Sequence, residues 1–264
     1  MSAPSPAVGG PPALEVRGVS LRFGGLQALD DVGFQVAPGE RLGLIGPNGA
    51  GKTTCLRVIA GVFAPDRGRI CLAGQSIDGL PPHRRVGAGL AMTNQIVRPL
   101  RSMSIAENVA LAWGHRRAGG LLRAFVRAER GPALARAREL LARVGIADYA
   151  DGPASGVPLG VLKRLEVARA LALEPRVVLF DEPLAGLNSI EATRLADLIA
   201  SLTDDGLTVV LVEHNLREVV RVCDRLVVLE SGRVLAEGAP ATVMRIPEVI
   251  AAYVGEEVAD ARGA

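Results

Sequence analysis

The first third of the chain contains stretches in which apolar and polar residues alternate, as they do in half-buried strands. Residues 14–21 and 32–36 show this alternation, with turn residues at 24–25 and 38–39 between and after them. Residues 69–73 return as a further strand. Together these segments predict an antiparallel β edge attached to the start of a parallel core.

Further along, short continuous apolar runs alternate with helical segments. Runs of this kind, bounded by turn residues, are typical of strands buried on both faces of a parallel sheet. Helices between them would cover that sheet, and a helical stretch follows the last strand. The predicted strands are 41–45, 177–180, 207–212, 226–229 and 233–236, and the predicted helices are 52–60 and 189–202.

The middle of the chain, residues 104–145, is composed mostly of Ala, Leu, Arg and Glu. Leu134, Ala137, Leu141 and Val144 fall on one helical face, and charged residues lie mostly on the other. We therefore expect a helical insert, whose basic face is interpreted as solvated rather than as a binding surface.

Composition adds limits to this picture. The 264 residues suffice for one large α/β domain, and 49% hydrophobic residues are ample for a core. The formal net charge of +2 is dispersed, which gives no case for a nucleic acid partner. The three cysteines and three histidines lack metal-ligand spacing, and the cysteines suggest a reducing compartment.

The N-terminus and the hydropathy bear on location. Residues 1–13 are rich in Pro, Ala and Gly, without the basic start and apolar stretch of a signal peptide, so we expect a disordered lead-in. No segment approaches the roughly 18 apolar residues that a membrane span requires. A cytoplasmic protein is predicted.

The strongest chemical signal is the octet GPNGAGKT at residues 46–53, which follows a predicted strand and precedes a predicted helix. This is a phosphate-binding loop: glycines let backbone N–H groups surround phosphate oxygens, Lys52 supplies a charge for them, and the Thr53 hydroxyl suits Mg²⁺. Only Lys52 and Lys163 are lysines among 30 basic residues, which also favours a specific role for Lys52. The alternative is a chance glycine-rich turn. The expected nucleotide-binding residues here are Gly46, Pro47, Asn48, Gly49, Ala50, Gly51, Lys52, Thr53 and Thr54.

Two later strands also end in candidate site residues. Asp181 ends a buried strand, where a carboxylate can hold Mg²⁺, usually through water. Glu182 follows and can polarise the water that attacks a γ-phosphate, and His214, after another strand, can contact that phosphate. We expect Glu182, His214 and Lys52 to be catalytic. Taken singly, an ordinary acidic strand end and a surface histidine are the alternatives.

The order of these motifs resembles the ATP-binding subunit of ABC transporters, over nearly the whole chain after residue 13. The resemblance implies an α/β P-loop NTPase with a mainly parallel sheet, an antiparallel β subdomain and a helical subdomain. The domain would cover residues 14–245, with the helical subdomain at about 96–170 and a tail at 246–264.

The same resemblance assigns further residues. Phe23 would stack on adenine, and Gln95 would ligate Mg²⁺ together with Thr53 and Asp181 and relay the nucleotide state to a membrane subunit. Residues 184–188 would touch the opposite ATP site across a dimer. The cofactors implied are ATP and Mg²⁺.

Four segments look like the branched-chain amino acid importer ATPases: FGGL at 23–26, RLEVARAL at 164–171, AGLN at 185–188 and PEVIAAYVGE at 247–256. Relatives in that group serve other small polar solutes, including amides and urea. The implied partners are two transmembrane permeases, a second ATPase subunit and, indirectly, a solute-binding protein. The chain would then lie on the inner face of the cell membrane.

One motif departs from the family. The signature, normally LSGGQ, should precede Arg164, but the aligned residues are Val157, Pro158, Leu159, Gly160 and Val161. Pro158 removes the serine hydroxyl that contacts γ-phosphate, together with a backbone N–H. Because each ATP lies between one subunit's phosphate loop and the other's signature, we expect a heterodimer in which the partner supplies an intact signature.

Other readings remain open from the sequence. A soluble ABC-type ATPase outside transport usually carries tandem cassettes or long inserts, which this chain lacks. A regulatory cassette with little hydrolysis would explain the altered signature but leaves Asp181, Glu182 and His214 unexplained. A small-molecule kinase would need a substrate lid that is not identifiable.

Overall fold

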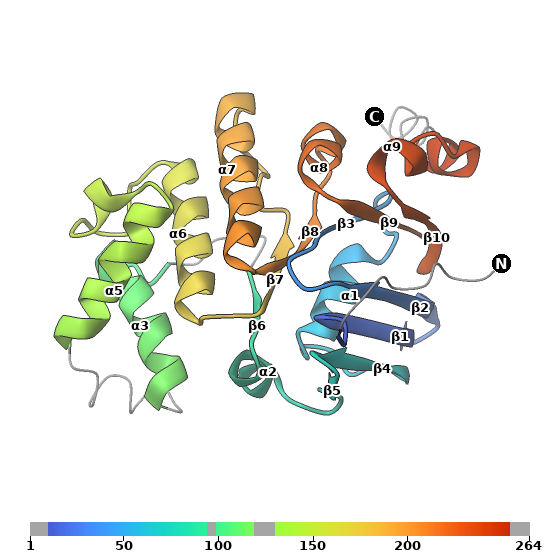
Figure 1. Ribbon diagram of the computed structural model, residues 1–264, viewed down its shortest axis with the longest axis horizontal. Coiled ribbons are helices and arrows are strands. Elements are labelled where there is room, and N and C mark those ends of the chain that lie inside the picture. Colours follow the sequence, from blue (N-terminus) through green and yellow to red (C-terminus); the bar gives the residue numbers. More distant parts are fainter. Residues whose placement is uncertain (1–9, 94–98, 119–129, 254–264) are drawn as a thin grey trace.

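The structure is a computed structural model that describes residues 10–93, 99–118 and 130–253. The N-terminal strands form a four-stranded antiparallel sheet of their own, in the order β2-β1-β4-β5 (Figure 1). The predicted antiparallel β subdomain is confirmed, and its strands pair with one another in a sheet of their own rather than with the parallel sheet. Their bounds are β1 (Leu14–Phe23), β2 (Leu26–Val36), β4 (Arg67–Leu72) and β5 (Gln75–Ser76).

A second sheet has six strands in the order β10-β9-β3-β8-β7-β6. Five are parallel, and β10 pairs antiparallel with β9 at one edge. The carboxyl ends of β3, β8 and β7 therefore lie along one edge, where ligands bind in open α/β sheets. The bounds are β3 (Arg41–Ile45), β6 (Leu90–Met92), β7 (Val177–Asp181), β8 (Thr208–Val212), β9 (Arg225–Glu230) and β10 (Arg233–Gly238).

Helix α1 lies between the two sheets (Figure 1). Its buried residues share one core cluster with both sheets, including Leu56 from α1, Val16 from β1 and Leu179 from β7. The opposite face of the parallel sheet is covered by other helices and by a second core cluster. The bounds are α1 (Lys52–Ile59), α2 (Pro82–Ala88), α7 (Ser189–Ser201), η2 (Leu202–Asp205), α8 (Leu216–Val222) and α9 (Pro240–Val243).

The predicted helical insert is present, at the end of the molecule away from the antiparallel sheet (Figure 1). It contains α3 (Ile105–Ala118), α5 (Arg130–Arg143), η1 (Ala147–Tyr149) and α6 (Leu159–Ala172). Ala137, Leu141 and Val144 are fully buried in its core and Leu134 packs against them, as the periodicity predicts. No helix in the described ranges is long and apolar enough to cross a membrane.

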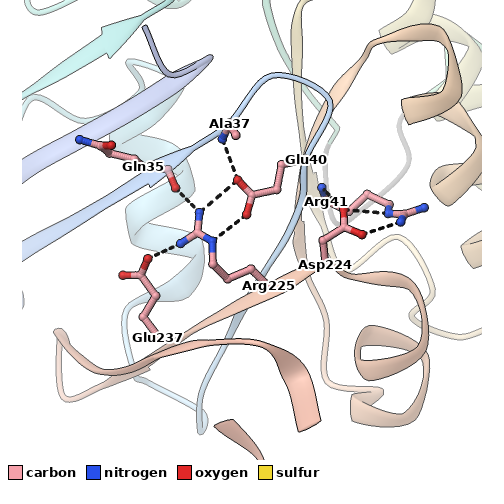
Figure 2. Close-up of polar contacts among 7 residues, drawn as sticks. All are labelled: Gln35, Ala37, Glu40, Arg41, Asp224, Arg225 and Glu237. Atoms are coloured by element: carbon pink, nitrogen blue, oxygen red, sulfur yellow. Dashed lines mark hydrogen bonds and ion pairs between the residues drawn. The ribbon is translucent and has the colours of Figure 1, made fainter. Parts of the chain in front are cut away.

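A half-buried arginine joins the two sheets. Arg225, at the start of β9, donates to both carboxylate oxygens of Glu40 at 2.7 and 3.1 Å, to the Gln35 carbonyl of β2 and to Glu237 of β10 (Figure 2). Its side chain is only 25% exposed, and that of Glu40 is 12% exposed. Half-buried charges with several partners fix geometry more firmly than surface pairs do. This junction holds the antiparallel sheet against the edge of the parallel sheet.

Candidate functional site

The loop at residues 46–53 joins β3 to α1 and requires glycine at two places. Gly46 has φ +147°, and a Cβ there would lie 2.0 Å from the Leu229 carbonyl oxygen. Gly51, at φ +100°, would place a Cβ 2.7 Å from the Ala28 carbonyl oxygen. Positive φ and close backbone approach both exclude larger residues. The backbone can therefore curl as a phosphate-binding loop needs.

Lys52 begins α1 and is 6% exposed. Its ammonium group donates to the carbonyl oxygens of Gly46 at 2.6 Å and Pro47 at 2.8 Å. These bonds hold the charge within the curve of the loop, next to the positive end of the α1 dipole. The arrangement concentrates positive potential where an anion would sit.

Asp181, the last residue of β7, is 1% exposed and accepts a hydrogen bond of 3.1 Å from the Thr53 hydroxyl. Burial raises the pKa of Asp181, and the Thr53 hydroxyl opposes this rise. A buried carboxylate beside a hydroxyl at the start of α1 is a pair of hard oxygen ligands. The two fit Mg²⁺, which binds through few protein oxygens and completes its shell with phosphate and water.

Glu182 and His214 form a hydrogen-bonded pair, with 2.9 Å between Glu182 Oε1 and His214 Nε2. Glu182 has φ +51°, a left-handed conformation that is unusual for a residue other than glycine. Its backbone N–H donates to the Val212 carbonyl at 2.9 Å, which ties the end of β7 to the end of β8. Backbone strain of this kind clusters at functional sites.

These groups face one cleft of about 290 Å³. Residues of the phosphate loop line the cleft together with Thr53 and Thr54, and so do Glu182 and His214. Phe23 is 44% exposed, lines the cleft and meets Phe63 edge-on at 5.1 Å between ring centroids. The lining residues are Phe23, Leu26, Gln27, Ala28, Asn48, Gly49, Ala50, Gly51, Lys52, Thr53, Thr54, Glu182 and His214.

Two buried charged residues next to this cleft were not predicted as site residues. Glu213, 4% exposed, accepts hydrogen bonds from the backbone N–H groups of Leu184 and His214. Lys163 of α6, 5% exposed, donates to the Glu182 carbonyl at 3.1 Å. Each could have been noticed in the sequence. Lys163 is the second of only two lysines, and Glu213 directly precedes His214.

Of the remaining predicted residues, Gln95 is outside the described residues. The altered signature forms the start of α6, where Pro158 is the N-cap and makes no side-chain capping bond. The signature residues, Val157 to Val161, are not among the described residues that line the cleft. This placement is what a site completed by another subunit would require.

The segment after Glu182 packs against the signature at Gly186. A Cβ on Gly186 would lie 2.9 Å from Leu159 Cδ2, so the signature leucine covers this glycine closely. Asn188 then caps α7 through a capping box with Glu191. Leu159 itself remains 42% exposed and Ile190 63% exposed.

Comparisons with known proteins agree with the geometry. The family described as "ABC transporter" matches residues 29–185, and "Branched-chain amino acid ATP-binding cassette transporter" matches residues 233–259. The chain is similar to the high-affinity branched-chain amino acid transport ATP-binding proteins LivG of Escherichia coli, at 38% identity, and BraF of Pseudomonas aeruginosa, at 40%. Each alignment covers 93% of this chain and 98% of the relative. A solved ATP-binding cassette of an ABC transporter, in its ADP conformation, superposes with a TM-score of 0.82 and 29% identity, covering 93% of this chain and 99% of that one.

Proposed function

This chain belongs to the ATP-binding proteins of ABC transporters, as an importer ATPase homologous to those for branched-chain amino acids, and we propose that it powers uptake of branched-chain or other small amino acids. The observation that carries the proposal is the Glu182–His214 pair, 2.9 Å apart at the end of a phosphate-loop cleft. A soluble ATPase outside transport or a regulatory cassette is not favoured, because the relatives reported above are transport proteins over nearly their whole length.

The phosphate loop binds the ATP phosphates in this proposal. Backbone N–H groups of residues 48–51 and the α1 N-terminus surround the oxygens, and Lys52 turns from its loop carbonyls toward the β- and γ-phosphates. Thr54 lines the same cleft. Phe23 also lines the cleft, where its exposed ring stacks on adenine and its edge contact with Phe63 holds it in place.

Thr53 and Asp181 hold Mg²⁺, Asp181 through water, and Gln95 is the further ligand that the family resemblance implies. When bound, the ion neutralises charge that develops on the phosphate oxygens. The Thr53–Asp181 hydrogen bond of 3.1 Å keeps both oxygens at one end of the loop. Burial of Asp181 excludes bulk water from competing with these contacts.

Glu182 orients the attacking water and accepts its proton. His214, bonded to the Glu182 carboxylate, contacts the γ-phosphate and so makes the carboxylate's position depend on whether that phosphate is present. Lys52 offsets the negative charge that builds on the transferring group. These three side chains are the catalytic residues of the proposal.

The assembly is a heterodimer of ATPases on two transmembrane permeases, fed by a solute-binding protein, at the inner face of the cell membrane. Support comes from the signature: Pro158 offers neither a hydroxyl nor an N–H, and only Gly160 and the α6 N-terminus retain anion-binding capability. One site then joins this phosphate loop to a partner's intact signature, and the other is impaired.

The test is purification of the tagged chain from membranes, followed by identification of the co-purifying proteins. We expect two permeases, a second ATPase and a solute-binding protein, and no membrane partner would overturn the transporter role. In the purified complex, Glu182→Gln should retain ATP binding and lose hydrolysis by about 100-fold or more. Unchanged turnover in that variant would remove Glu182 as the catalytic carboxylate.

A further inference from the structure

The backbone of Glu182 is held from both sides. Its N–H donates to the Val212 carbonyl at 2.9 Å, and its own carbonyl accepts from Lys163 Nζ at 3.1 Å. A left-handed φ of +51° at a non-glycine residue persists only where surrounding contacts impose it. Lys163 supplies one of those contacts, and it does so from α6 rather than from the sheet.

Lys163 is a charged residue in a place where charge is costly. It is 5% exposed, and burial lowers its pKa, while the carboxylates of Glu213 and Glu182 act in the opposite direction. A buried ammonium is retained only where carboxylates and hydrogen-bond acceptors compensate its lost hydration. The compensating groups here are those of the catalytic end of the cleft.

Glu213 binds the backbone of two residues that lie next to Glu182, Leu184 and His214. Its Oε1 accepts from the Leu184 N–H at 2.5 Å, and its Oε2 accepts from the His214 N–H at 3.3 Å. One buried carboxylate thus fixes the backbone two residues after Glu182 and the backbone of the histidine that Glu182 bonds. Residues 184–188 in turn run under the signature leucine, Leu159.

We propose that Lys163 and Glu213 are positioning residues that hold the Glu182–His214 pair in its reactive arrangement and couple it to the signature helix α6. The inference rests on the proposed catalytic role of Glu182. Lys163 lies one helical turn beyond Leu159 in α6, so its side chain transmits a displacement of the signature to the Glu182 carbonyl. Nucleotide held at the impaired site thereby adjusts the catalytic carboxylate of the intact one.

The decisive variant is Lys163→Met, which keeps the length and apolar body of the side chain and removes the ammonium donor. In the complex purified from membranes, kcat should fall by about 100-fold, the loss expected when a reacting group is misplaced. The KM for ATP should stay within about 2-fold, because Lys52 and the phosphate loop are untouched.

Arg164→Met is the matched control. Arg164 is the next residue of the same helix and donates to a backbone carbonyl, that of Val144, at 2.6 Å, but this contact lies in the helical subdomain. Each variant loses one hydrogen bond from a cationic side chain of α6 to a backbone carbonyl outside that helix. Arg164→Met should leave kcat within about 3-fold of the parent. Equal losses of kcat in the two variants would show a purely structural role and overturn the proposal.

Glu213→Gln gives a second, independent readout, and decides the matter if Lys163→Met does not fold. An amide keeps one acceptor oxygen but turns an NH₂ group toward the other backbone N–H, so kcat should again fall by at least about 10-fold at unchanged KM. Unchanged kcat in Glu213→Gln would overturn the proposal. If the parent complex hydrolyses ATP and Glu182→Gln abolishes this, while neither Lys163→Met nor Glu213→Gln slows it, the coupling fails and the proposed function stands.

Discussion

At the scale of single residues, three buried charges lie beside the Glu182–His214 end of the cleft. Asp181, Glu213 and Lys163 are each at most 5% exposed, in a chain whose other charged residues lie mostly at the surface. Burying a charge is unfavourable unless partners compensate, so clusters of this kind mark sites where geometry matters more than stability. Burial dominates the pKa values of all three groups: it raises the pKa of Asp181 and of Glu213, and it lowers the pKa of Lys163.

The effect of burying the Glu213 carboxyl can be measured as a dependence of protein stability on pH. Burial raises its pKa from the ordinary 4.5 to about 6, partly offset by the N–H groups of Leu184 and His214. The folded state therefore holds this proton more tightly than the unfolded state, and the resulting stability is present below about pH 4.5 and lost as pH rises through 6. The difference amounts to about 2 kcal/mol, since each pH unit corresponds to about 1.4 kcal/mol.

Urea denaturation of the parent and of Glu213→Gln between pH 4 and 7 isolates this contribution, because other titrating groups are common to both proteins. The parent should lose about 2 kcal/mol of unfolding free energy relative to the variant as pH rises across this range. A constant difference between the two would show that the carboxyl of Glu213 titrates normally.

At the scale of elements, the sequence predicted what is local and missed what depends on contacts between distant segments. Long apolar runs made β7 and β8 predictable, and the turn glycines identified the loop before α1. Strand β6 has only three residues, Leu90–Met92, too short for a periodic signal, and it forms because β7 provides a partner. Likewise, no local pattern shows that Lys163 of α6 reaches the end of β7.

The contact between the two sheets gives a prediction at this scale. Arg225→Met removes the donor that satisfies Glu40, Gln35 and Glu237 together, leaving the 12% exposed carboxylate of Glu40 without its arginine. We expect a loss of about 2–3 kcal/mol in the free energy of unfolding, measured by urea denaturation. Arg233→Met is the control: Arg233 also links β10 to β2, through Asp30, but its side chain is 72% exposed, so the loss should stay below about 1 kcal/mol. Equal losses of unfolding free energy in the two variants would show that the burial of Arg225 does not increase its contribution to stability.

At the scale of the whole molecule, the proposed function gives the chain two parts of ATP sites, the phosphate-loop cleft and the altered signature. The phosphate loop, Asp181, Glu182 and His214 stand at one edge of the parallel sheet, and the signature stands at the start of α6. In the proposed function, catalysis by this chain depends on a second subunit, and the kind of subunit required follows from the signature. A partner with an intact signature would restore one site, whereas a second copy of this chain would restore none.

Repair of the signature tests this dependence. Pro158 has φ −55° and ψ +151°, a conformation that serine also adopts, and it occupies the N-cap of α6 without a capping side chain. Pro158→Ser should therefore fold at least as well as the parent, since serine is a favoured N-cap worth up to about 1 kcal/mol and the buried Val161 is left unchanged. It also returns a hydroxyl and an N–H that can meet the γ-phosphate of a second copy.

The purified parent chain, without other subunits, should hydrolyse ATP slowly, and the repaired chain about 100-fold faster, the value of a donor aimed at transition-state charge. Its rate per chain should rise with protein concentration, because the active species is a dimer of the repaired chain. Adding Glu182→Gln to the repaired chain should abolish the gain, which assigns it to this site. A parent chain that alone matches the repaired one would show that Pro158 supports hydrolysis, and the need for a different partner would then disappear.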